Sequence, residues 1–144
     1  MRIWRISEFA DLSGEGGRLF PSRWNRREVP IVYCADHPST SLLEIMVHTS
    51  RENLPDSYQL LGIAIPDDIQ AISAVLPSDW QRNTRATQDV WDDFVLKGEH
   101  SLLRVPSIIM PQAFNYLLNP AHPDAAKLTI AQIWRYPFDS RLLM

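Results

Sequence analysis

Proline is the feature that most constrains how this 144-residue chain can fold. Proline lacks a backbone N–H and is disfavoured inside helices and central strands, so each proline marks a boundary between short segments. The chain has eleven of them, at Pro21, Pro30, Pro38, Pro55, Pro66, Pro77, Pro106, Pro111, Pro120, Pro123 and Pro137. Because the short segments between them mix strand-like and helix-like patterns, the sequence predicts an α/β (α+β) fold with short strands in a central sheet flanked by helices.

The segments predict two helices and a set of strands. Residues 38–48 and 84–97 have helical patterns, since Pro38 suits a first helical turn and Gly98 suits a C-terminal stop. Apolar, often β-branched runs predict the strands, which are residues 3–6, 31–34, 58–65, 101–105, 107–110, 114–118 and 130–136. No repeat, linker or change of composition divides the chain, so we expect a single domain over residues 1–144.

The sequence also indicates where the protein acts. Cys34 is its one cysteine, so it can form neither an internal disulfide nor a Cys-rich zinc site. No apolar run approaches the roughly 18 residues that a membrane helix needs, and the first residues lack the apolar core of a secretory signal. We therefore expect a cytoplasmic protein with no membrane association.

The net charge of the chain narrows the classes of ligand that the protein is expected to bind. Fourteen basic and seventeen acidic residues give a net charge of −3. Proteins that bind nucleic acid without specificity usually have a basic excess, so we expect no direct nucleic-acid partner and disfavour a ribonuclease. The one basic cluster is Arg18, Arg23, Arg26 and Arg27, followed at once by Glu28. This cluster suits either a small phosphorylated ligand or a solvated loop, and composition does not separate the two.

Residues 38–48 carry a polar pair that admits two interpretations. At helical spacing, Glu44 and His48 share one side of the helix, opposite its apolar residues. A pair of this kind is either a solvent-facing contact or part of a polar face turned into a cleft. Periodicity alone leaves both interpretations open.

Other chemistries lack their sequence signatures. The four histidines have no metal-ligand spacing, so no metal site is expected. The glycine-rich loop at residues 13–17 lacks the Gly-Lys-Ser/Thr ending of a phosphate-binding loop, and no Gly-x-Ser-x-Gly motif is present. Cys34 lies in an apolar strand and is expected to be an inert, buried thiol.

A series of motifs, in the right order along nearly the whole chain, resembles the RES domain family. Arg23 and Tyr33 are ten residues apart, and Tyr33 and Glu44 are eleven apart, as in the family pattern. This chain departs from the family pattern at Pro21-Ser22, where the family more often has Gly-Gly. The motifs are Arg23-Trp24-Asn25, Val29-Pro30-Ile31-Val32-Tyr33, Ser41-Leu42-Leu43-Glu44, Val47-His48, Leu102-Leu103-Arg104-Val105-Pro106-Ser107, the run from Phe114 to Pro123 with its Asn119-Pro120-Ala121-His122-Pro123, and the closing Phe138-Asp139-Ser140-Arg141-Leu142.

The resemblance implies a fold similar to ADP-ribosyltransferases and an enzyme that consumes NAD+. RES proteins are toxins of bacterial toxin–antitoxin pairs, and their partner is an Xre-type helix-turn-helix antitoxin. The resemblance therefore implies a toxin that depletes NAD+ by cleaving the nicotinamide–ribose bond, with NAD+ as substrate and no metal or additional cofactor. One alternative is transfer of ADP-ribose to a protein target, and a more distant one is a non-catalytic binding module.

Carried over from the family, the catalytic positions are Arg23, Tyr33, Glu44 and Ser107, and Asn119 is a further substrate-binding position. Nicotinamide leaves as a neutral molecule, so no general acid is required and one carboxylate, Glu44, can stabilise the positive charge on the ribose or orient water. Arg23 can bind a phosphate through its planar fork of donors, and Tyr33 can stack on the cationic nicotinamide ring. Ser107 can hold either the carboxylate or the ribose in place.

Overall fold

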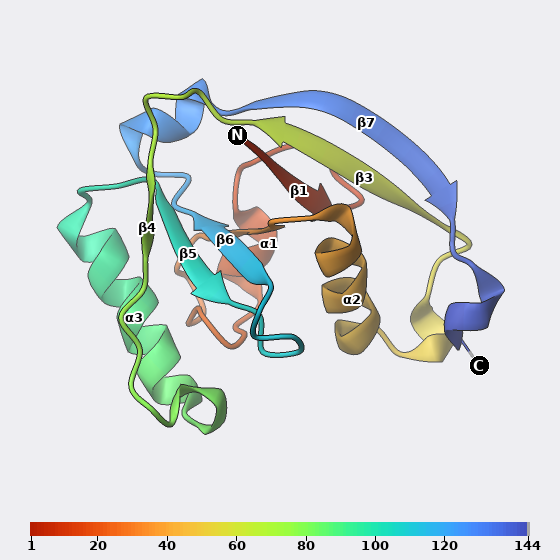
Figure 1. Cartoon of the computed structure of the whole chain (residues 1–144), viewed down its shortest axis with the longest axis horizontal. Coiled ribbons are helices and arrows are strands. Elements are labelled where there is room, and N and C mark those ends of the chain that lie inside the picture. The colour runs from red at the N-terminus through yellow and green to blue at the C-terminus, as the bar shows by residue number, and fades with distance from the viewer. Residues whose placement is uncertain (144) are drawn as a thin grey trace.

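The computed structural model describes residues 1–143, which form one seven-stranded sheet with three α-helices (Figure 1). The strand order is β4-β5-β6-β2-β1-β3-β7, and within the described residues β4 and β5 are the one parallel pair. This architecture confirms the predicted α/β class. The elements are β1 (Arg2–Ile6), α1 (Glu15–Leu19), β2 (Val32–Ala35), α2 (Pro38–His48), β3 (Ser57–Ala64), β4 (Ala71–Ser73), α3 (Thr84–Lys97), β5 (Leu102–Pro106), β6 (Phe114–Leu118) and β7 (Thr129–Pro137).

The two longer helices have the predicted bounds because their ends are capped by local contacts. At the start of α2, the His37 ring accepts a hydrogen bond from the backbone N–H of Ser39 (3.1 Å), and proline occupies the first turn. At the start of α3, the Asn83 side chain accepts from the N–H of Ala86 (3.0 Å). Gly98 ends α3 with a φ of 61°, a left-handed conformation that glycine adopts without strain.

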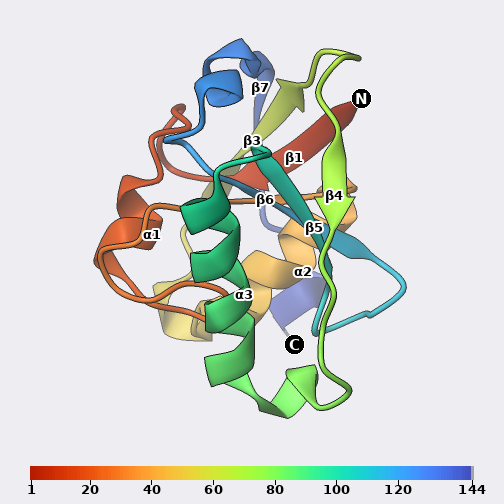
Figure 2. The ribbon, with the colours of Figure 1, turned by 90° about the vertical axis from the view of Figure 1, so that its left-hand side faces the viewer.

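The hydrophobic core has two parts because successive side chains of a strand point to opposite faces of the sheet. On one face, Leu103 of β5 and Leu117 of β6 pack with Trp91 and Phe94 of α3. On the other face, residues such as Leu118 pack with apolar side chains of β1 and β3. Figure 2 shows α3 in front of the sheet and α2 behind it. Helix α2 packs against β1 and β2 and so stands beside the two strands at the middle of the sheet.

One predicted strand is wrong. Residues 107–110 belong to the loop that joins β5 to β6, which closes through a hydrogen bond from the Ser107 N–H to the Ala113 carbonyl (2.9 Å). The Ser107 hydroxyl accepts from the N–H groups of Ile109 and Met110 (3.2 and 3.3 Å), so the side chain takes backbone donors that a strand would need. The sequence also did not predict β4 or α1, whose few residues carry little periodic signal.

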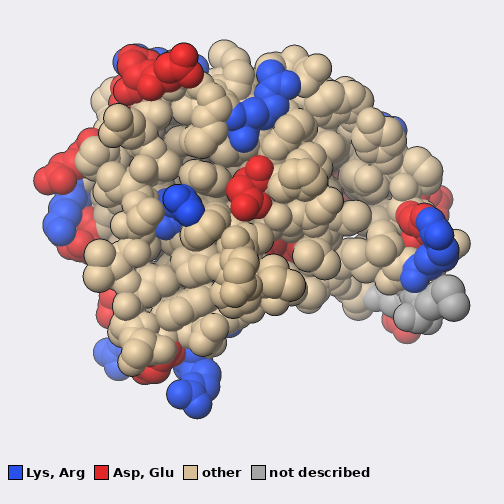
Figure 3. Space-filling model, in the orientation of Figure 1, with Lys and Arg blue, Asp and Glu red and all other residues tan. Residues whose placement is uncertain are grey.

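Charge is mixed over the surface. Figure 3 shows basic and acidic side chains scattered over one face of the molecule, with no continuous basic field on that face. Within residues 1–143, no helix has both the length and the apolarity needed to cross a membrane. Across the same residues, no three His, Cys, Asp or Glu side chains gather as metal ligands would.

Candidate active site

The candidate active site is a pocket of about 610 Å³ beside α2 and the adjoining ends of β1, β2 and β6. Its wall includes Arg23, Tyr33 and Glu44, which are three of the five predicted site residues. Arg5 of β1 and Asn115 of β6 line it as well. Since these residues are separated by up to 110 positions in the chain, it is the fold that brings them together.

Glu44 faces this pocket, which answers the question that helical periodicity left open. Its Oε1 accepts one hydrogen bond from the Ser107 hydroxyl and one from the Asn115 side-chain amide, both at 2.9 Å. Both donors are almost fully buried, at 1% and 8% exposure. The second oxygen, Oε2, lies 3.8 Å from Nε2 of His48, one helical turn further along α2. One carboxylate oxygen is therefore fixed by the protein, and the other is free of such strong donors.

Ser107 thus holds the carboxylate rather than lining the pocket wall. It sits directly after β5, and its hydroxyl accepts from two backbone N–H groups of the following loop while donating to Glu44. Those two contacts set the direction of the hydroxyl proton. Of the two predicted partners for Ser107, carboxylate or ribose, the structure shows the carboxylate.

The hydroxyl of Tyr33 is held by the buried side-chain amide of Asn25. This hydroxyl donates to Oδ1 of Asn25 (2.6 Å) and also contacts the Ser22 hydroxyl. Asn25 is fully buried and donates through its own nitrogen to the carbonyl of Gly17 (2.6 Å). Burial raises the pKa of Tyr33 to about 12, so the phenol is neutral at physiological pH. Tyr33 can offer an aromatic face to a ligand but cannot serve as a base.

The arginine cluster divides into two kinds of side chain. Arg18 pairs with Glu15 (3.1 Å) and Glu28, and Arg26 pairs with two aspartates of α3, so the pKa of each guanidinium is raised. Arg23 has no carboxylate partner among the described residues. It donates instead to the carbonyl of Gln81 (3.2 Å) and lines the pocket. Of the four arginines of the cluster, Arg23 is the one that lines the pocket, and no carboxylate among the described residues pairs with it.

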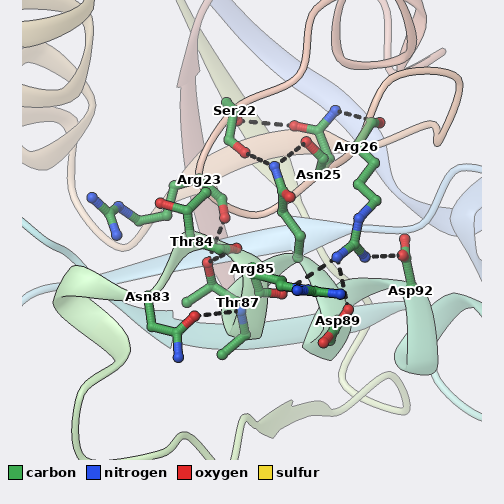
Figure 4. A network of polar contacts seen from close by, with 12 residues as sticks. Ser22, Arg23, Asn25, Arg26, Asn83, Thr84, Arg85, Thr87, Asp89 and Asp92 are labelled. Carbon is green, nitrogen blue, oxygen red and sulfur yellow. Dashed lines mark hydrogen bonds and ion pairs between the residues drawn. The ribbon is translucent and has the colours of Figure 1, made fainter.

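The loop that carries Arg23 is fastened to α3, as Figure 4 shows. Arg26 reaches Asp89 (2.8 Å) and Asp92, and the Gln88 amide donates to the Ser22 carbonyl (2.8 Å). The Thr87 hydroxyl donates to the carbonyl of Arg23 (2.5 Å). These contacts fix the backbone on both sides of Arg23 and so set where its side chain begins.

The glycine-rich loop serves packing rather than the pocket. Gly14 has a φ of 74°, which disfavours other residues there. A Cβ added to Gly17 would lie 2.7 Å from the carbonyl oxygen of Ile31, so only glycine allows this loop to approach the residues that lead into β2. None of these glycines lines the pocket.

Asn119 is not brought into the site. It follows the end of β6 opposite to Asn115, and its side chain accepts from the N–H of Ala121 (3.0 Å) within a turn. Its backbone N–H donates to the Ser101 carbonyl (2.8 Å). The predicted substrate contact through Asn119 therefore has no support in this geometry, because the side chain holds the turn after the strand.

Arg5 and Asn115 are two of the polar pocket residues that sequence reasoning missed. Arg5 donates to the carbonyl of Tyr33 (2.9 Å), while its Nε is buried with no partner among the described atoms. Asn115 is the second donor to Glu44. The available signal was a polar residue between two non-charged, largely apolar neighbours in a strand. For Asn115 this signal points to the site only once strand pairing places it opposite Ala35.

Comparison with known proteins shows the family to which the chain is related. The RES domain model matches residues 2–139. The chain is 40% identical to Toxin Res of Pseudomonas putida over 145 residues, which is 99% of each chain. It is 33% identical to the Prs ADP-ribosylating toxin of a Sphingobium species over 98% of this chain and 96% of that one, and 37% identical to Toxin Res of Photorhabdus laumondii over 91% and 87%. The chain belongs to the RES domain family.

Proposed function

We propose that this RES-family protein is a toxin that cleaves the nicotinamide–ribose bond of NAD+ and so depletes it. The observation that carries the proposal is the Glu44 carboxylate, held at one oxygen by Ser107 and Asn115 (2.9 Å each) and open at the other toward the pocket. The predicted enzymatic class agrees with the family, whose curated members include an ADP-ribosylating toxin.

The chemistry requires few groups. As the glycosidic bond breaks, positive charge builds on the ribose while nicotinamide becomes neutral, so the protein needs a fixed negative charge and no proton donor. The two donors to Oε1 hold the Glu44 carboxylate in one place, which avoids the cost of reorienting it during the reaction. Oε2 is then the oxygen that faces the ribose.

The remaining pocket groups suit the rest of NAD+. Two guanidinium groups, Arg5 and Arg23, line the pocket without a carboxylate partner among the described residues and offer donors to the pyrophosphate. Tyr33 offers its aromatic face to the cationic nicotinamide. The pocket of about 610 Å³ is within the usual range for ligand sites.

Transfer of ADP-ribose to a protein is the second candidate. Besides the named activity of the Sphingobium relative, one feature of this structure favours it. A second hollow of about 460 Å³ shares Ile6 and Ile45 with the pocket, so the two cavities adjoin. A protein segment seated there would lie beside the ribose and take the place of water as the nucleophile.

The proposed biology follows from the chemistry. An enzyme that drains NAD+ harms its own cell, so we propose that an Xre-type helix-turn-helix antitoxin accompanies this chain and that both act in the cytoplasm. The toxin names of the relatives support the existence of such a partner.

The decisive experiment is incubation of the purified protein with NAD+ alone, followed by measurement of nicotinamide and ADP-ribose. Release of both products supports hydrolysis, whereas release that requires an added protein acceptor supports transfer. Glu44→Gln should lower either activity by about 10²–10³-fold. Glu99→Gln, at an exposed position outside the pocket, is the matched control. No consumption of NAD+ under either condition would overturn both candidates.

A further inference from the structure

We infer that His48 receives the proton of the attacking nucleophile from Glu44 and passes it to solvent. This inference rests on the proposed function and adds a residue to it. His48 follows Glu44 by one helical turn, and its Nε2 lies 3.8 Å from Oε2, the carboxylate oxygen that is not held by Ser107 and Asn115. The histidine side chain is 66% exposed and that of Glu44 22%, so the pair leads from the pocket toward water.

The reaction has a proton that must leave. The bond between C1′ of the ribose and the nicotinamide nitrogen breaks, and its electron pair stays on nicotinamide. The nucleophile, water or an acceptor hydroxyl or amine, forms a new bond to C1′ and carries one proton in excess. Oε2 of Glu44 takes that proton, Nε2 of neutral His48 takes it from Glu44, and bulk water takes it from the imidazolium. The carboxylate is thereby returned to its charged form for the next turnover.

The separation of 3.8 Å exceeds a hydrogen bond, which for these atoms is about 2.7–3.2 Å. One side-chain rotation or one bridging water closes that gap, and the exposure of His48 permits both. Proton acceptance at Nε2 requires the neutral tautomer whose hydrogen is on Nδ1.

The other titratable groups of the pocket do not suit this role. Arg5 and Arg23 carry hydrogen-bond donors and no acceptor atom that could take a proton. The Tyr33 hydroxyl donates a hydrogen bond to Oδ1 of Asn25, and burial raises its pKa to about 12. Burial likewise raises the pKa of the Cys34 thiol to about 12. Histidine is the side chain that exchanges protons between pH 5 and 8, and His48 is the histidine that lines this pocket among the described residues.

The test compares His48→Gln and His48→Ala with wild type and with His100→Gln, a histidine outside the pocket. NAD+ consumption is measured from pH 5 to 8, with the acceptor present if transfer requires one. We expect kcat of His48→Gln to fall by up to about 10²-fold, the low end of general acid–base contributions, with little change in KM. The acidic limb of the wild-type kcat profile should disappear in this variant. Added imidazole should restore His48→Ala in a saturable manner, whereas His100→Gln should match wild type.

The outcomes separate the two proposals. A wild-type protein that consumes no NAD+ overturns the proposed function, whatever the variants do. An active wild type with an unchanged kcat and pH profile in His48→Gln overturns the role of His48 alone. A loss of kcat that keeps the acidic limb and resists imidazole also overturns it, because such a loss indicates a contact that positions Glu44 without moving a proton.

Discussion

Glu44 has two oxygens in different surroundings, and its expected kinetics follow from that difference. In the proposed reaction the charge of Glu44 matters most when the ribose becomes cationic. Glu44→Gln should therefore lower kcat by about 10²–10³-fold, roughly 3–4 kcal/mol, with KM for NAD+ almost unchanged. Steady-state kinetics measure both constants, and a thermal melt confirms that the variant folds. A Glu44→Gln protein with wild-type turnover would contradict this mechanism.

The donors to Oε1 should matter less than the carboxylate itself. Ser107→Ala removes one of two hydrogen bonds to a charged group, each worth about 1.5–3 kcal/mol, and we expect kcat to fall by roughly tenfold or more. Ser101→Ala is a matched control, since Ser101 is equally buried and its hydroxyl has no partner among the described atoms. Equal activities of the two alanine variants would show that Ser107 does not serve Glu44.

Tyr33 makes stability sensitive to alkaline pH. Its pKa is raised by burial from 10.0 to about 12, so above pH 10 the unfolded chain loses a proton that the folded chain keeps. The free energy of unfolding should therefore be unaffected by Tyr33 below pH 10 and should fall by roughly 2–3 kcal/mol as the pH rises to 12. Cys34 acts in the same direction from pH 9, with a pKa raised to about 12. Denaturant titrations at successive pH values should show a shallower decline for Tyr33→Phe, and an identical decline would contradict the assignment.

At the scale of elements, the loop at residues 22–26 depends on its fastening to α3. Arg26→Ala removes the pairs with Asp89 and Asp92, and the backbone that carries Arg23 is then less fixed. We expect KM for NAD+ to rise, by up to about 10²-fold if the loop moves by about 1 Å. Arg27→Ala is the control, because Arg27 is exposed and has no ion pair among the described residues. Similar KM values in both variants would show that the fastening does not position Arg23.

The two longer helices were predicted with their correct bounds because their ends are determined locally. The bounds of α2 and α3 follow from neighbouring caps, namely His37, Asn83 and Gly98. The run at residues 107–110 is just as apolar as a strand, and it becomes a loop because the Ser107 hydroxyl takes its backbone donors. That contact is invisible in a hydropathy pattern.

The site was predictable only through resemblance, and only in part. Spacing alone left Glu44 between surface and cleft, because the deciding contacts come from Ser107 and Asn115, more than sixty residues away. Arg5 was missed for the same reason, since its neighbour Tyr33 lies on another strand. Asn119 was carried over from the family pattern, yet in this fold its side chain holds the turn that follows β6.

For the whole molecule, the expected consequence is toxicity that depends on one carboxylate. Expression of the wild-type chain alone should lower cellular NAD+ and arrest growth, and Glu44→Gln at equal protein level should do neither. Co-expression of the proposed Xre-type antitoxin should restore both growth and NAD+. Normal growth at high levels of the lone wild-type chain would contradict the proposal.

The position of β1 in the sheet determines how much of the chain must be synthesised before the pocket can form. The strand that is synthesised first lies inside the sheet, between β2 and β3, and its Arg5 belongs to the pocket. Strand β2 pairs with β6, and Asn115 of β6 is one of the two donors that fix Glu44. A nascent chain must therefore be made at least as far as β6 before any pocket exists, so incomplete translation products should be harmless. Because of this topology, the pocket and any toxic activity that depends on it form only after most of the chain has been synthesised.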